Sequence, residues 1–149
     1  MRANQPIFFI CKTLQKTSVS TFMTNELFGR GRIWNGKTFL LRKGDEISGR
    51  GINRFVPKAT ESQLGITETQ HEFDISVLPS KIWKGVNTIT LSYKPYQTTI
   101  SPWWSMKDEL RILRMPNKKK DESGILIGFG CMSWSGGSLN SSPFCLIQE

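Results

Sequence analysis

Apolar and polar residues alternate with a period of two in several short segments of the chain. In segment 67–78, Phe73, Ile75 and Val77 share one side while charged and hydroxyl side chains take the other, and segment 87–93 repeats the pattern. Such alternation is typical of β-strands with one buried face. These two segments are therefore predicted to be strands of an antiparallel sheet.

Glycine and proline interrupt the chain at short intervals, and no long stretch has the periodicity of an amphipathic helix. Asn35-Gly36 is a strong signal for a tight turn or a β-bulge. We expect an all-β fold with little helix, a single antiparallel β-barrel of about seven to ten strands. The other expected strands are 33–41, 47–56, 106–115, 124–134 and 144–147.

The length of 149 residues suits one domain, which we expect to span residues 26–149. Residues 1–25 contain Arg2, Lys12 and Lys16 but no acidic residue, and they are rich in serine and threonine. This composition fits either an organelle transit peptide or a plain N-terminal arm outside the barrel. The first alternative places the protein in an organelle, and the second in the cytoplasm.

Charge and cysteine content restrict the function only loosely. The net charge of +8 becomes +5 for residues 26–149 once the three basic residues of segment 1–25 are subtracted. This charge leaves an anionic ligand or nucleic acid open as a partner. Three cysteines without metal-ligand spacing predict no metal site and no cofactor, and buried free thiols are favoured over a Cys131–Cys145 disulfide. No apolar run approaches the roughly 18 residues of a membrane span.

The pair Trp103-Trp104 follows a loop bracketed by prolines and precedes an expected strand. Adjacent side chains in a strand face opposite sides, so one indole would point inward and the other outward. The pair is a candidate ligand contact, as a lid or platform at a cavity mouth. The alternative is one core tryptophan with a partly exposed neighbour.

Further candidate ligand contacts lie on other expected strands. His71 is in register with Phe73 and would face inward, where an imidazole can bind or transfer a proton. Glu109 and Arg111 share one face of their strand, an arrangement that suits either a ligand-binding pair or a plain surface ion pair. Arg54 offers a positive charge beside an aromatic residue.

The segment Gly31-Arg32-Ile33-Trp34, the late Asp108-Glu109-Leu110-Arg111 and the glycine-bearing closing strands resemble lipocalin-like (calycin) barrels. Segment 34–39 is also similar to the W-x-G-K-x-F opening of small bacterial barrels. The family motif is G-x-W, whereas this chain has Gly-x-x-Trp. The resemblance implies a barrel for apolar ligands and a structural contact between Trp34 and Arg111 at its closed end.

Taken together, these features favour non-enzymatic binding of a small apolar or amphipathic ligand, including an anionic one, inside the barrel. One alternative is a barrel enzyme, an isomerase or hydrolase, that uses His71 and Glu109, or Asp108. The other is an RNA-binding barrel, for which nucleic acid is the partner. Its candidate contacts are Arg30, Arg32, Arg50 and Arg54.

Overall fold

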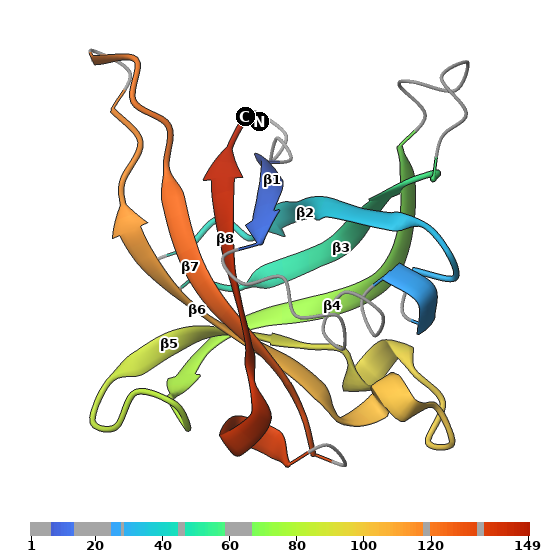
Figure 1. Ribbon diagram of the computed structural model, residues 1–149. Coiled ribbons are helices and arrows are strands. Elements are labelled where there is room, and N and C mark those ends of the chain that lie inside the picture. Colours follow the sequence, from blue (N-terminus) through green and yellow to red (C-terminus); the bar gives the residue numbers. More distant parts are fainter. Residues whose placement is uncertain are drawn as a thin grey trace.

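The protein folds as a closed antiparallel β-barrel (Figure 1). The computed structural model describes residues 7–13, 25–27, 29–44, 47–58, 67–117, 120–133 and 136–149. Within these ranges eight strands are present, with one π-helical turn at residues 25–27 and short 3-10 helices, which confirms the all-β prediction. The strands are β1 (Ile7–Thr13), β2 (Ile33–Leu41), β3 (Gly49–Val56), β4 (Glu68–Pro79), β5 (Asn87–Ser92), β6 (Met106–Arg114), β7 (Ile125–Met132) and β8 (Ser142–Gln148).

Each strand pairs with the next one along the chain, and β8 returns to pair with β1. This up-and-down order is compatible with the lipocalin-like architecture. The 3-10 helices η3 (Lys94–Tyr96) and η4 (Pro102–Ser105) lie between β5 and β6, and η7 (Gly137–Asn140) lies between β7 and β8. Connections that follow odd-numbered strands lie at the same end of such a barrel, so η3, η4 and η7 mark one end.

The first strand corrects the expected domain boundary. Segment 1–25 was expected to lie outside the barrel, but β1 pairs with β2 from Ile7 to Ile10 and with β8 from Phe9 to Thr13. Figure 1 shows β1 beside β8, where it closes the sheet. The barrel domain therefore includes residues 7–13, because without them β2 and β8 would each lose a neighbour.

Two β-bulges change which residues face the barrel interior. The β2–β3 register shifts between Trp34 and Gly36, and Gly36 has a φ of 144° that favours glycine. The Asn35-Gly36 signal therefore marks a bulge. Because an extra residue is inserted there, both Trp34 and Lys37 turn toward the interior although they are three positions apart. The second shift lies opposite His71, whose φ is 59°.

Aromatic rings pack over glycines inside the barrel. A Cβ atom at Gly51 would overlap the Phe73 ring, and one at Gly128 would lie 2.6 Å from Phe144 Cε2. Glycine is needed at both positions because the rings occupy the space of a side chain. The buried apolar core consists of Phe9, Phe39, Phe55, Phe73, Ile75, Leu91, Tyr93, Leu110, Leu126, Phe144 and Leu146.

Candidate functional site

Four polar side chains meet inside the barrel, and we call them the polar core: Lys37, Asn53, Tyr93 and Asp108. They come from β2, β3, the residue after β5, and β6, and each is at most 1% exposed. Lys37 Nζ lies 2.8 Å from Asp108 Oδ2, so the polar core contains a fully buried ion pair. Burying two charges is costly unless both are well paired, which makes this the most unusual feature of the interior.

Hydrogen bonds join the four side chains into one network. Lys37 Nζ donates to Asn53 Oδ1 at 2.7 Å and to the Tyr93 hydroxyl at 2.6 Å. The Tyr93 hydroxyl donates to Asp108 Oδ2 at 2.7 Å, and Asn53 Nδ2 donates to the backbone oxygen of His71 at 3.0 Å. The network thereby links the four strands across the interior. Asn53 and Tyr93 use their hydrogen-bonding capacity within the protein.

Aromatic rings surround the ammonium group of Lys37. Its Nζ atom lies 5.0 Å from the centroids of both Trp34 and Phe73, and 5.7 Å from that of Phe144. Cation–π attraction is strongest where water is excluded, so these rings stabilise the buried charge together with Asp108. Trp34 Nε1 also donates to Asn53 Oδ1 at 3.1 Å.

One atom of the polar core lacks a partner among the described residues. Asp108 Oδ1 is buried without a hydrogen bond, although Oδ2 of the same carboxylate accepts from Lys37 and Tyr93. A Cβ atom placed on Gly130 would lie 3.0 Å from Oδ1, with Phe144 and Met106 about it. Gly130 therefore lies directly beside an unused acceptor, and a side chain at this position would press against it.

Burial and the nearby charge of Asp108 raise the pKa of Tyr93 well above its ordinary value. Burial and the hydrogen bond to Asp74 also raise the pKa of Tyr96. Both effects favour the neutral phenol. Tyr93 therefore acts in the polar core as an uncharged hydroxyl at neutral pH.

We expect the folded protein to give little phenolate absorbance at about pH 10, where an unfolded tyrosine is half ionised. The chain has two tyrosines, and the pKa of each is raised. Stability from neutral Tyr93 is complete below about pH 10 and is lost as the pH rises toward the raised value. A spectrophotometric titration of folded and urea-unfolded protein measures this, and equal phenolate signals from the two states would contradict it.

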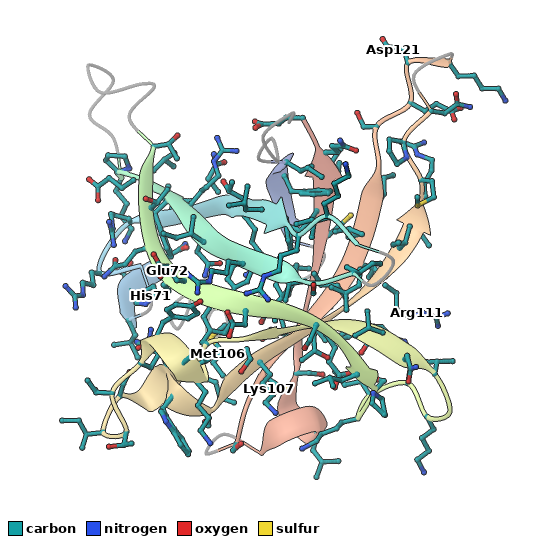
Figure 2. All side chains as sticks on the ribbon, turned by 180° about the vertical axis from the view of Figure 1, so that it is seen from behind. His71, Glu72, Met106, Lys107, Arg111 and Asp121 are labelled. Carbon is teal, nitrogen blue, oxygen red and sulfur yellow. The ribbon has the colours of Figure 1, made fainter. Side chains whose placement is uncertain are left out.

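Aromatic side chains cover the polar core toward η4, and we call Trp34, Phe55, His71, Trp103 and Met106 the aromatic end. The His71 ring lies 6.1 Å from that of Phe55 and 6.5 Å from that of Trp103. All but Phe55 are half-buried, so this end reaches toward the surface. Figure 2 shows His71 and Met106 on the same side of the barrel, beside the short helices.

The expected ligand contacts divide between this end and the outer face. His71 lies at the aromatic end, where Gln97 Nε2 is 3.4 Å from its Nδ1. Trp103 packs against the core, whereas the Trp104 ring lies 4.4 Å from Lys94 Nζ. The two tryptophans belong to η4 rather than to a strand.

Glu109 and Arg54 lie on the outer face, which corrects their expected place in a cavity. Glu109 accepts from Ser80 Oγ and from the backbone nitrogen of Lys81 at 2.9 Å, so it fixes the turn after β4. Arg54 forms an ion pair with Glu149 at 2.7 Å. Both alternate along their strands with polar-core residues, which is why they point away from the interior.

The expected contact between Trp34 and Arg111 is also corrected. The guanidinium carbon of Arg111 lies 5.8 Å from the centroid of the Trp83 ring, on the outside of the barrel. Figure 2 shows Arg111 pointing away from the barrel, far from His71 and Met106. The cation over Trp34 is that of Lys37, because the β2 bulge brings both side chains inward.

Other candidate sites receive limited support. No disulfide joins Cys131 to Cys145, and Arg32 pairs with Glu68. Within the described ranges, no group of three acidic, histidine or cysteine side chains is arranged to hold a metal ion. No helix in the part of the chain that the structure describes is long and apolar enough to cross a membrane.

The chain has no significant match among protein-family models, curated proteins or solved structures. The calycin resemblance therefore has the barrel architecture as its support.

Proposed function

We propose that the barrel binds one small apolar or amphipathic molecule at the aromatic end, without chemical conversion. The observation that carries this proposal is the polar core, a buried network that lies under a partly exposed aromatic wall. Ligand sites in proteins commonly combine apolar walls with a few fixed polar groups. The aromatic end would contact the apolar part of the ligand, and the polar core its polar group.

The exposure of the aromatic end supports its choice as the binding site. Trp34, His71, Trp103 and Met106 are half-buried, whereas Phe73 and Leu110 deeper in the barrel are fully buried. A ligand at the aromatic end would therefore contact side chains that are already partly exposed.

The alternatives are less well supported by the positions of their residues. An enzyme that uses His71 with Glu109 would need both side chains on the same face of the barrel sheet, whereas Glu109 holds a turn on the outer face. Asp108 is then the acid–base candidate of the polar core. For RNA binding, Arg32 and Arg54 are already engaged by acidic side chains, which weakens a charge-based interface.

The test is a titration with 1-octanol, followed through tryptophan fluorescence, because Trp34 and Trp103 both line the aromatic end. We expect saturable binding to the wild type. Trp103→Ala should weaken it about tenfold, which corresponds to about 1.4 kcal/mol of lost aromatic contact.

Trp104→Ala is the matched control, because its ring contacts Lys94 rather than the core. Its affinity should stay within about twofold of the wild type, since it leaves the proposed wall intact. Circular dichroism checks that both variants are folded. Absence of saturable binding to the wild type, or equal loss in the two variants, would refute the proposed site.

A further inference from the structure

We propose that the bound molecule is neutral and carries an O–H or N–H donor, which it directs to Asp108 Oδ1. This inference rests on the proposed function and names the chemical class of its ligand. It starts from Asp108 Oδ1, which has no hydrogen-bond partner in the described part of the chain and belongs to a carboxylate that is 1% exposed. A buried acceptor without a donor is costly, so a donor from a ligand would stabilise the complex.

The surrounding hydrogen bonds determine what Oδ1 can bind. Asp108 Oδ2 already accepts from Lys37 and Tyr93. The amide oxygen of Asn53 accepts from Lys37, and its amide nitrogen donates to the backbone of His71. These bonds fix the carboxylate in one orientation, with Oδ1 toward Gly130. An ionised carboxylate only accepts hydrogen bonds, so a ligand group placed there has to donate.

The same geometry disfavours an anionic ligand. The positive charge of Lys37 is matched by Asp108 at 2.8 Å. A second carboxylate beside Oδ1 would be repelled by Asp108 in a site with little water to screen the charges. An alcohol or a primary amide avoids this repulsion and supplies the missing donor.

The surroundings of Gly130 limit what can approach Oδ1. A Cβ atom on Gly130 would lie 3.9 Å from Phe144 Cε1 and 4.0 Å from Met106 Cε. Met106 belongs to the aromatic end and is half-buried, so a ligand from that end would pass this side chain to reach Oδ1. A hydroxyl on a slender chain would approach Oδ1 more readily than a bulky head group.

The experiment compares 1-octanol, 1-methoxyoctane and octanoate on the folded full-length chain. The ether has an oxygen but no donor, so the wild type should bind the alcohol about tenfold more tightly than the ether. Octanoate should bind more weakly than the alcohol. Equal binding of alcohol and ether would overturn the inference, and leave the proposed function standing.

Asp108→Asn tests the role of Oδ1 directly. Lys37 and Tyr93 both donate to the Oδ2 position, so the amide oxygen should stay there and the amide nitrogen should replace Oδ1. The site then offers a donor, which both alcohol and ether can accept. The alcohol and the ether should therefore bind about equally well to this variant. An unchanged preference for the alcohol would contradict the proposed contact with Oδ1.

Gly130→Ala provides an independent test if Asp108→Asn does not fold. Its methyl group would lie 3.0 Å from Oδ1 and block the approach of a donor, so alcohol binding should fall to the level of the ether. Gly44→Ala is the control, because no atom lies within 4 Å of its Cβ position. If neither ligand binds to the wild type, the proposed function fails and this inference fails with it.

Discussion

Replacing Lys37 with methionine should lower the free energy of unfolding by about 3–5 kcal/mol. The change leaves the carboxylate of Asp108 buried without its cation, and Tyr93 supplies the one remaining hydrogen bond to Oδ2. The cost of an uncompensated buried charge exceeds the value of the ion pair itself. Urea unfolding, followed by circular dichroism, measures the effect.

A double variant separates the charge effect from loss of packing. Lys37→Met with Asp108→Leu removes both charges and should be more stable than Lys37→Met alone. Arg54→Gln is the surface control, because its pair with Glu149 is partly exposed and should contribute about 0–1 kcal/mol. A Lys37→Met variant as stable as Arg54→Gln would show that the ion pair is not buried as described.

Gly51→Ala should destabilise the barrel by about 3 kcal/mol, at the upper end of the usual cost of overpacking. The added methyl group would overlap the Phe73 ring and lie 2.6 Å from the backbone oxygen of Thr38. The ring is fully buried, so it has little room to move, and the β2 backbone is held by its neighbours. The same urea unfolding experiment measures this change.

The control for this prediction is again Gly44→Ala. Open space surrounds its Cβ position, so the substitution should be neutral or should stabilise by up to about 1 kcal/mol through the unfolded chain. A difference in sign between the two glycines would locate the cost in the native packing. Equal stability of the two variants would contradict the described contact between β3 and Phe73.

Alternation predicted most strands because one face of each is buried against the interior. The first strand was not predicted, because its short apolar run lies in a segment with basic and hydroxyl residues. Nothing in the local sequence indicates a partner strand. Its pairing depends on the free edges of β2 and β8, which lie far away in sequence. Closure of the sheet is a property of the whole chain.

The polar core was predictable only in part. The sequence places Asp108 on one face with Leu110, and Tyr93 in register with Leu91, so two of its members carried an inward signal. The inward turn of Lys37 depends on the bulge at Asn35. Which polar groups meet across the interior depends on strand register, which no local pattern contains.

The pairing of the first strand with the last has a consequence for how the chain folds during synthesis. Phe9 lies opposite Gln148, so β1 leaves the ribosome long before its second partner exists. Until then β1 and β7 each present an open edge, which invites pairing with other chains. Such long-range contacts also slow folding. Closure is therefore the step at which nascent chains would benefit most from a chaperone.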